Sequence, residues 1–360
     1  MNLKKLISLL KNKKTLIITG KKSFSKSGAK KKYKFLKKCQ TYFYFKKNFI
    51  PEIKELKKII SLIIKFKPDY ILSIGGGAVL DLAKSSNFLW EVKNLKDSIM
   101  NLDYKKQKNF CPLIAIPTTA GSGAEVTSNA VIYINKKKYS VEHKNIKPKI
   151  FLLDANFVKS NSLNLKNSSG FDAIAQAVES LISVRSNNTS VQFSIKSLEY
   201  SLNNYLNYIN RPNSVNSKNM LLASNLSGKA IDITKTTAPH ALSYPFTARF
   251  NISHGHAVSL TFTEFLKFNF KNSHFSKTDF SLNERMKILL KLTGAQNLHE
   301  LIKFFRKIQK GAKLEQDFKK LNINVEKNFP VILKDINLSR LSNNPVPVSQ
   351  ETIKKILLKR

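Results

Sequence analysis

The sequence predicts an α/β domain built on a parallel sheet, followed by a second domain that is all helical. Short apolar runs alternate with helical patterns over roughly the first 150 residues, and mainly helical patterns recur after about residue 160. Strand–helix alternation is typical of a parallel sheet with helices on both faces. The length suits two domains, and we expect them to span residues 1–160 and 161–360.

The expected strands of the first domain are short, apolar or aromatic-rich runs that end near turn-forming residues. They are 15–19, 41–45, 70–74 and 113–116, with one helix at 53–66 and another after Gly77. In the second domain, Gly170 is expected to precede a long helix through 173–182. Further helical patterns recur at 190–208, 218–232, 256–270, 282–293, 297–309 and 350–358.

The charge of the chain is extreme, at a formal +39, and such charge first suggests nucleic acid. Only seven of the 62 basic residues are Arg, however, and the Lys residues are scattered through every segment. No nucleic-acid-reading motif accompanies them. We therefore expect no nucleic-acid partner, although so positive a field favours encounter with small anionic substrates.

Cysteine content and hydropathy exclude several classes of protein. Cys39 and Cys111 are the only cysteines, too few for a disulfide framework or a zinc finger. The apolar run at residues 6–10 is too short for a signal peptide. No segment approaches the roughly 20 apolar residues of a membrane span. We expect a cytoplasmic protein with no membrane partner.

A glycine-rich turn follows the strand expected at residues 70–74. Gly75, Gly76 and Gly77 lead into a helix that carries Asp81 and Lys84. Glycine lets the backbone approach an anion closely, and a helix N-terminus offers free N–H groups, which suits the pyrophosphate of a dinucleotide. A turn without a ligand, and an ion pair between Asp81 and Lys84, remain the alternatives.

A second segment rich in small polar residues follows the strand at residues 113–116. Thr118, Thr119 and Ser122 stand among glycines at positions 121 and 123. Such a loop can line a ribose or a nicotinamide, and a solvent-exposed turn is the alternative.

Two histidines and one carboxylate are the candidate metal ligands. His240 and His254 lie fourteen residues apart, and Asp172 lies near the expected start of the long helix after Gly170. Imidazole is the commonest transition-metal ligand, and three protein ligands leave an open position for catalysis. From these residues alone, core or surface histidines remain an alternative.

Taken together and in this order, these segments resemble the iron-containing (group III) alcohol dehydrogenases, whose fold is related to dehydroquinate synthase. The family's Gly-Gly-Gly-Ser-x-x-Asp-x-Ala-Lys turn is matched by residues 75–84, with Ala78 in place of Ser. Its Pro-Thr-Thr-x-Gly-x-Gly-x-Glu-Val-Thr loop is matched by residues 117–127, and its C-terminal signature by residues 340–345. The spacing of His240 and His254 is also the family's.

The resemblance implies a Rossmann-like NAD(P)-binding domain, a helical metal-binding domain, and an active site in the cleft between them. It implies NAD(P)H as cofactor together with Fe²⁺ or Zn²⁺, and it allows a homodimer. The residues it assigns to the cofactor are Gly20, Gly75, Gly76, Gly77, Asp81, Lys84, Thr118, Thr119 and Ser122. It assigns the metal to Asp172, Gln176, His240 and His254.

Three positions depart from the family. Gln176 replaces a metal-ligating His, and an amide is a poor ligand for a transition metal. Tyr244 replaces a His that follows the first late ligand by four residues, which leaves Tyr244 or His256 to assist protonation of the alkoxide. Gly20 stands where NAD-specific members often carry Asp, so repulsion of a 2′-phosphate is lost and NADPH is admissible.

One subgroup fits these departures better, because residues 19–28, 172–180 and 243–256 resemble phosphonoacetaldehyde reductases. These enzymes make 2-hydroxyethylphosphonate in phosphonate biosynthesis. Arg185 and Arg249 are candidate cations for the phosphonate, because Arg is rare here and both lie close in sequence to the expected site. Their alternative is a surface position.

The sequence therefore predicts a metal-dependent, NAD(P)H-linked alcohol dehydrogenase that reduces an aldehyde to a primary alcohol. A general short-chain aldehyde reductase of the same family is the nearest rival. A dehydroquinate-synthase-like lyase is disfavoured by the form of the Thr-rich loop. A non-catalytic dinucleotide-binding homologue that lost its metal through Gln176 is the rival from another class.

Overall fold

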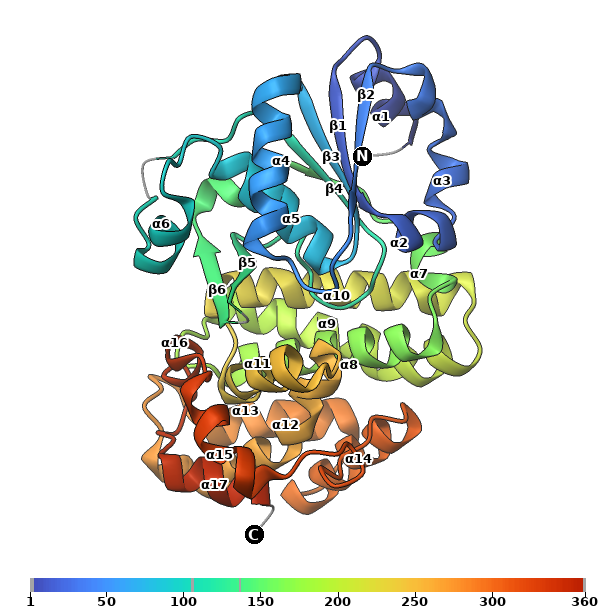
Figure 1. Cartoon of the computed structure of the whole chain (residues 1–360). Coiled ribbons are helices and arrows are strands. Elements are labelled where there is room, and N and C mark those ends of the chain that lie inside the picture. The colour runs from blue at the N-terminus through green and yellow to red at the C-terminus, as the bar shows by residue number, and fades with distance from the viewer. Residues whose placement is uncertain (1–2, 105–106, 136, 359–360) are drawn as a thin grey trace. The chain divides into compact units, whose positions relative to one another are not determined.

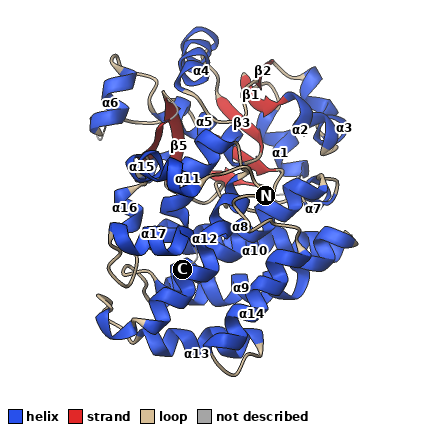
Figure 2. Cartoon of the chain, turned by 60° about the horizontal axis from the view of Figure 1, so that its bottom comes forward, coloured by secondary structure: helices blue, strands red, loops and turns tan. Residues whose placement is uncertain are grey.

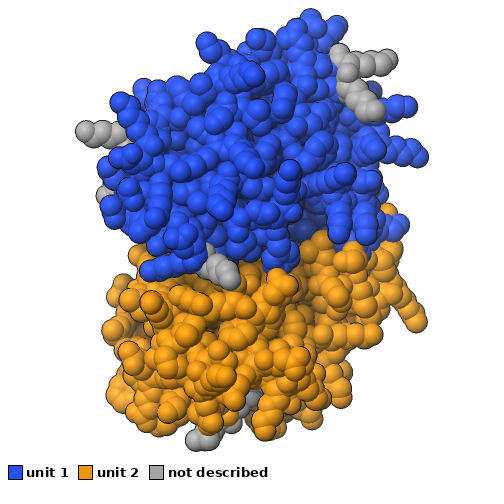
Figure 3. Space-filling view, in the orientation of Figure 1, with its two compact units in different colours: residues 1–161 blue, residues 162–360 orange. Residues whose placement is uncertain are grey.

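The computed structural model describes residues 3–104, 107–135 and 137–358. The chain divides into two compact units, residues 1–161 and 162–360, which Figure 3 shows in different colours. The strands lie in the first unit, and the described part of the second unit is helical (Figure 2). The sequence prediction of an α/β domain followed by an all-α domain is thereby confirmed.

A five-stranded parallel sheet forms the centre of the first unit, with strand order β2-β1-β3-β4-β7. Its strands are β1 (Thr15–Gly20), β2 (Thr41–Lys46), β3 (Tyr70–Gly75), β4 (Leu113–Pro117) and β7 (Ile150–Phe151). The first four confirm the predicted strands to within one residue at each end. An antiparallel pair, β5 (Asn129–Ile134) and β6 (Lys137–Glu142), was not predicted.

Helices cover both faces of this sheet, as Figure 1 shows. Each face of the sheet contributes to its own hydrophobic core, because alternate residues of a strand point to opposite faces. Leu16 and Ile18 of β1 belong to one core, and Ile17 belongs to the other. The first core packs against α4 (Ile53–Phe66) and α5 (Gly77–Phe88), and the second against α1 (Leu3–Leu10) and its neighbours. The remaining helices of the unit are α2 (Lys21–Lys26), α3 (Ala29–Lys32), η1 (Lys34–Lys38), α6 (Leu95–Asn101), η2 (Lys144–Ile146) and α7 (Ala155–Lys159).

The second unit begins with three long helices that pack on one another: α8 (Leu163–Ile182), α9 (Asn188–Asn210) and α10 (Ser214–Thr234). Then follow α11 (Ala238–Phe250), α12 (His254–Lys271), η3 (Ser273–Phe275), α13 (Leu282–Thr293), α14 (Leu298–Gly311), α15 (Val325–Lys334), α16 (Leu338–Leu341) and α17 (Gln350–Leu358). Among the described residues, no helix is both long and apolar enough to cross a membrane.

The expectation that the long helix follows Gly170 was wrong. α8 begins at Leu163, so Gly170 lies inside it and Asp172 is its tenth residue. A Cβ at position 170 would lie 2.4 Å from the ring of Tyr205 on α9. The glycine lets the two helices approach closely, and this packing outweighs its poor helix propensity of about 1 kcal/mol.

Helix α11, which carries His240, was not predicted because it contains two prolines. Pro239 lies in the first turn, where a missing N–H is tolerated. Pro245 lies inside the helix and cannot donate to the carbonyl of Ala241. That carbonyl instead accepts from the backbone N–H of Asn337, at 3.5 Å.

Candidate metal centre and dinucleotide-binding segments

Three helices of the second unit bring Asp172, His240 and His254 together. One ligand atom from each residue lies within 4.8 Å of the other two. Oδ1 of Asp172 lies 3.1 Å from Nε2 of His240 and 3.9 Å from Nε2 of His254. The donors are two imidazole nitrogens and a carboxylate oxygen, a set that suits Fe²⁺ or Zn²⁺.

Glu179 holds the inner histidine in place. Its Oε1 accepts from Nδ1 of His240 at 2.5 Å. A carboxylate that binds one ring nitrogen fixes the tautomer and turns the other nitrogen toward the ligand cluster. Nε2 of His240 is therefore the atom available to a metal.

The same carboxylate anchors the start of α11. Oε2 of Glu179 accepts from the backbone N–H of Thr237 at 2.7 Å and from its hydroxyl at 2.8 Å. Asn343, from the C-terminal segment, donates to the carbonyls of Thr234 and Thr236. These bonds fix the turn that leads into α11, and with it the position of His240.

Gly255 sets the position of the outer histidine. A Cβ at this residue would lie 1.9 Å from the carbonyl oxygen of Ser168 and 2.9 Å from Cβ of Asp172. No L side chain fits such a space without backbone movement. The first turn of α12 can therefore press against α8 only because glycine follows His254.

The two histidines differ in exposure, at 5% for the His240 side chain and 34% for that of His254. Burial lowers the pKa of His240, but Glu179 and Asp172 outweigh it and raise the pKa to about 10. With no metal bound, His240 is therefore an imidazolium that donates to both carboxylates. The half-exposed edge at His254 leaves room for a fourth ligand beside the three protein groups.

Gln176, expected as a fourth ligand, lies one helical turn after Asp172 on α8 and is buried. Its Oε1 accepts from the hydroxyl of Ser227 on α10 at 3.0 Å. The amide oxygen is thus already engaged with Ser227, and the structure brings together three metal-type ligands without it.

The two residues expected to assist protonation lie in different surroundings. Tyr244 is buried one turn after His240, with its ring centroid 6.5 Å from that of His254. Nε2 of His256 instead donates to the carbonyl of Glu315 at 2.8 Å, and burial lowers the pKa of His256. Because residues two apart on a helix do not face each other, this placement favours Tyr244.

The two candidate substrate cations lie in different surroundings. Arg249 forms an ion pair with Asp335. Arg185 is exposed and lies beyond the end of α8, whose axis rises about 15 Å from Asp172 to Ile182. Binding of a phosphonate by either arginine therefore stays a prediction.

In the first unit, the two segments expected to bind the dinucleotide pack against each other. A Cβ at Gly76 would lie 3.2 Å from the Thr119 side chain, and one at Gly77 would lie 2.8 Å from Oγ of Ser122. Thr118 N–H donates to the carbonyl of Gly75. The glycine turn and the Thr-rich loop therefore form one small-residue surface at the carboxyl ends of β3 and β4, where open α/β sheets bind ligands.

Lys84 holds this loop in place. It is fully buried, and its Nζ donates to the carbonyls of Ala124 and Asn129 and to the hydroxyl of Thr127, at 2.9, 2.6 and 2.9 Å. Asp81 lies nearby, and burial raises its pKa to about 6 against the influence of Lys84. These contacts give Lys84 a positioning role beneath the loop.

Gly20 is the last residue of β1 and precedes α2, with φ −95° and ψ 134°. A Cβ there would meet Oγ of Ser23 at 2.7 Å, a hydroxyl that can rotate away. The end of the first strand is thus free of a carboxylate at this position.

Sequence reasoning missed the roles of Glu179 and Gly255. Asp172, Gln176 and Glu179 are spaced i, i+4 and i+7, so they share one face of α8. This spacing, with two carboxylates in a buried stripe, is the signal that could have identified Glu179. Gly255 carries no comparable signal, because its role depends on contact with α8.

Two curated enzymes illustrate the similarity of this chain to known proteins. The 4-hydroxybutyrate dehydrogenase of Clostridium kluyveri is 30% identical over 226 residues, 60% of this chain and 59% of that enzyme. The NADPH-dependent butanol dehydrogenase of Clostridium saccharobutylicum is 25% identical over 369 residues, 96% of this chain and 91% of that enzyme.

Solved structures agree over nearly the whole chain. An iron-containing alcohol dehydrogenase from Thermotoga maritima is 26% identical, with a TM-score of 0.83 over 99% of this chain and 94% of that one. The sulfoacetaldehyde reductase of Bifidobacterium kashiwanohense, solved with NAD⁺, is 21% identical, with a TM-score of 0.85 over 99% and 93%. The second likeness establishes the fold alone.

Residues 1–155 match the family described as iron-containing alcohol dehydrogenase, and residues 166–360 match the C-terminal part of the Fe-containing alcohol dehydrogenase family. The first match contains the glycine turn and the Thr-rich loop, and the second contains all three metal-type ligands. With sequence, fold and ligand cluster in agreement, the chain belongs to the iron-containing alcohol dehydrogenase family.

Proposed function

We propose that this chain is a metal-dependent, NAD(P)H-linked reductase that converts an aldehyde to a primary alcohol. The observation that carries the proposal is the Asp172, His240 and His254 cluster, with His240 oriented by Glu179. Three ligands with a half-exposed edge suit a catalytic metal better than a structural one, which is closed by four protein ligands.

Reduction delivers a hydride to the carbonyl carbon and a proton to the oxygen. A divalent metal held by Asp172, His240 and His254 would supply Lewis acidity toward that oxygen. The glycine turn and the Thr118–Thr119 segment bind the NAD(P)H and orient its nicotinamide. Tyr244, buried beside His254, would hydrogen-bond the alkoxide oxygen and assist its protonation.

For the substrate we propose an aldehyde that bears an anionic group, and phosphonoacetaldehyde in particular. The net charge of +39 favours anionic substrates. One relative, at 30% identity, is named for 4-hydroxybutyrate, whose carboxylate is such a group. The resemblance of residues 19–28, 172–180 and 243–256 to phosphonoacetaldehyde reductases supports the phosphonate specifically.

The first test is oxidation of NADH and NADPH by Fe²⁺- or Zn²⁺-loaded protein, with phosphonoacetaldehyde and propanal compared at equal concentration. We expect turnover with both and a higher kcat/KM for the phosphonate. Equal or higher rates with propanal would still support an aldehyde reductase but would refute the preference for a phosphonate. They would favour the general aldehyde reductase, which the similarity to a butanol dehydrogenase also favours.

Two variants test the metal cluster within that assay. Asp172→Ala and His254→Ala should abolish turnover while the NADPH affinity, measured by fluorescence, is kept. The matched control is His299→Ala, because His299 is an exposed histidine on α14. Retained activity in both cluster variants would refute the proposal.

The non-catalytic alternative predicts that the protein binds dinucleotide but retains no metal. Anaerobic loading with Fe²⁺ or Zn²⁺, followed by desalting and metal analysis, separates the cases. About one equivalent of metal per chain supports the enzyme, and none supports the binding protein.

A further inference from the structure

Gln176 lies on the face of α8 that also carries Asp172 and Glu179. Successive residues of a helix are about 100° apart, so Gln176 is turned by about 40° from Asp172. Ser180, about 40° farther round in the same sense, accepts from the hydroxyl of Thr234 on α10 at 2.9 Å. The Gln176 side chain therefore leaves α8 between the metal-type ligands and α10.

The oxygen of the Gln176 amide is held on the side of α10. Its Oε1 accepts from the hydroxyl of Ser227 on that helix, at 3.0 Å. The oxygen and the nitrogen of an amide point in different directions, so this bond turns Nε2 away from α10. On this face of α8, the direction away from α10 is that of Asp172, which lies 3.1 Å from His240. Nε2 of Gln176 therefore faces the ligand cluster.

This nitrogen is a hydrogen-bond donor whose capacity the protein does not use. Gln176 is 3% exposed, and no group in the described part of the chain accepts from its Nε2. Nor does Nε2 belong to the enclosed side-chain atoms that have neither a partner nor contact with solvent. Buried donors are normally paired, and an amide nitrogen carries two of them. The N–H groups of Gln176 are therefore open to a ligand beside the metal-type residues.

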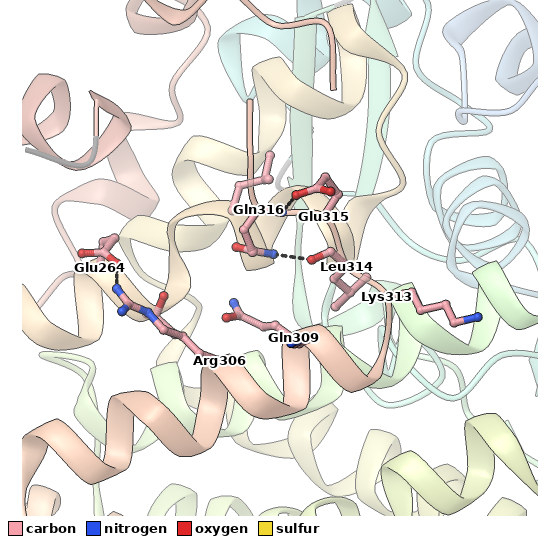
Figure 4. A pocket seen from close by; sticks show the side chains of 10 residues that line it. Glu264, Arg306, Gln309, Lys313, Leu314, Glu315 and Gln316 are labelled. Carbon is pink, nitrogen blue, oxygen red and sulfur yellow. Dashed lines mark hydrogen bonds and ion pairs between the residues drawn. The ribbon is translucent and has the colours of Figure 1, made fainter. Parts of the chain in front are cut away.

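Other glutamine amides of the second unit are used differently. Figure 4 shows two of them, Gln309 and Gln316, in the wall of a hollow lined by α12 and α14. Nε2 of Gln309 donates to the carbonyl of Ser259 at 2.9 Å, and Nε2 of Gln316 donates to the carbonyl of Leu314 at 3.0 Å. Their nitrogens bind the protein itself, which is the arrangement of an amide that stabilises the fold.

We propose that Gln176 is a catalytic residue whose Nε2 donates a hydrogen bond to the oxygen of the substrate aldehyde. The inference rests on the proposed reductase activity. Hydride transfer from NAD(P)H to the carbonyl carbon forms a C–H bond, breaks the C=O π bond and leaves its electron pair on the oxygen. An N–H group already in place stabilises this developing charge and keeps its own proton. The proton that completes the alcohol comes from water, with the help of Tyr244.

Ser227 is the positioning residue for this donor. Its hydroxyl selects the end of the amide that faces α10, and so the end that faces the ligand cluster. Without that bond the amide can turn and present Oε1, an acceptor that repels the charge on the substrate oxygen. An amide is a poor ligand for a transition metal, so a substrate contact also suits the residue type at position 176.

Gln176→Met tests the donor, because Met has a similar length and no N–H group. The Ser227 hydroxyl keeps the carbonyl of Ser224 as an acceptor, at 3.0 Å. With metal-loaded protein and saturating cofactor, kcat should fall about 100-fold or more, with propanal and phosphonoacetaldehyde alike. The metal affinity, measured by competition with a chelator, should stay within about twofold because the three metal-type ligands remain.

Two results of this experiment would overturn the proposal by giving Gln176 another role. A metal affinity that falls about tenfold or more would make Gln176 a metal ligand. A KM that rises with phosphonoacetaldehyde alone, at unchanged kcat, would make it a contact to the phosphonate.

Ser227→Ala tests the orientation of the amide. It should lower kcat about tenfold, because the donor remains but is no longer held in place. The double variant Q176M/S227A should have the same kcat as Gln176→Met alone, because the hydroxyl acts only through the amide. Losses that multiply in the double variant would overturn the assigned orientation.

Gln309→Met is the matched control, because it removes a buried amide whose nitrogen is bound within the fold. It should lower the melting temperature and leave kcat unchanged. Thermal unfolding of each variant checks that it folds. A native protein that reduces neither aldehyde would overturn the proposed function and this inference together. An active native protein with an equally active Gln176→Met variant would overturn the role of Gln176 alone.

Discussion

Glu179 binds the His240 ring through one carboxylate oxygen and the Thr237 backbone N–H and hydroxyl through the other. One side chain on α8 therefore fixes both the tautomer of a metal-type ligand and the first turn of the helix that carries it. A group that hydrogen-bonds a metal ligand without contacting the metal sets the basicity of that ligand and the orientation of its ring.

Glu179→Gln should weaken metal binding about 10- to 100-fold. The amide oxygen can still accept from Thr237, but the amide N–H₂ would face Nδ1 of His240. The ring would then carry its proton on Nε2, which is the wrong tautomer for a ligand. Competition with a chromophoric chelator measures the affinity.

The matched control is Glu199→Gln, on the exposed face of α9. It removes the same charge and should leave the metal affinity unchanged. Unaltered metal affinity in Glu179→Gln would contradict the assigned role.

Metal affinity should depend on pH through His240. Its folded pKa of about 10 lies above the model value of 6.5, so the stabilisation from its two carboxylate contacts is complete below about pH 6.5 and lost as the pH rises through 10. A metal must displace the Nε2 proton in this range. The affinity should therefore rise about tenfold per pH unit between pH 7 and 8.

Zn²⁺ titrations at pH 7.0, 7.5 and 8.0, corrected for protonation of the competing chelator, measure this slope. Glu179→Gln should flatten it, because the pKa of His240 falls when a neighbouring charge is lost. An affinity independent of pH in the native protein would contradict the displacement of a proton.

Local patterns sufficed for the parts of the fold that depend on near neighbours in the sequence. The helix at 53–66 and the first four strands follow from apolar periodicity. The β5–β6 hairpin was missed although Asn135, with φ 52°, is a typical residue for a tight turn. Helix α11 was missed because of its two prolines. The hydrogen-bond donor that replaces Pro245 at the Ala241 carbonyl is the N–H of Asn337, nearly a hundred residues away in the sequence.

The residues of the candidate site also fall into those that the sequence predicted and those that depend on contacts between distant segments. Asp172, His240 and His254 were expected because they resemble a family pattern, and the structure brings them together. Arg249 pairs with Asp335, a partner that no local pattern around Arg249 reveals. The role of Gly255 depends on the carbonyl of Ser168, which only the packing of α12 on α8 places there.

Gly255→Ala should strongly reduce the amount of metal that the protein binds. The new Cβ would overlap the Ser168 carbonyl and crowd Asp172, so the first turn of α12 must move away from α8. We expect a loss of about 1–3 kcal/mol in the free energy of unfolding, as for overpacked cores, and metal content well below one equivalent. Thermal unfolding and metal analysis after desalting measure both effects.

Gly311→Ala is the control, because its Cβ would meet only the flexible end of Leu206, at 3.1 Å. It should retain its metal. A Gly255→Ala protein with native melting temperature and full metal content would refute the proposed packing constraint.

Lys84→Met should weaken NADPH binding without affecting the metal. The change removes the Lys84 donor from the Ala124 and Asn129 carbonyls and from the Thr127 hydroxyl, and leaves the two carbonyls only long bonds from Thr127 Oγ1, at 3.5 and 3.4 Å. A buried group left without a partner costs about 1–3 kcal/mol. The Thr-rich loop then loses its anchor. The metal ligands lie in the other unit, so metal content should persist.

Fluorescence titration with NADPH and metal analysis test this pair of outcomes. Lys65→Met, at an exposed position on α4, is the matched control and should bind NADPH normally. If Lys84→Met bound NADPH as tightly as the native protein, the loop would not need this anchor.

Gly20→Asp should turn the cofactor preference away from NADPH. A carboxylate at the end of β1 repels a 2′-phosphate and can accept from the ribose hydroxyls of NADH. We expect the ratio of kcat/KM for NADPH to that for NADH to fall by about tenfold or more, a change of roughly 1.4 kcal/mol.

Gly20→Asn introduces a side chain of the same size without charge, and it meets the same Ser23 hydroxyl. A fall in the Asp variant alone assigns the effect to charge. Equal falls in both variants would assign it to the lost space at Gly20, and no change in either would place the 2′-position of the cofactor elsewhere.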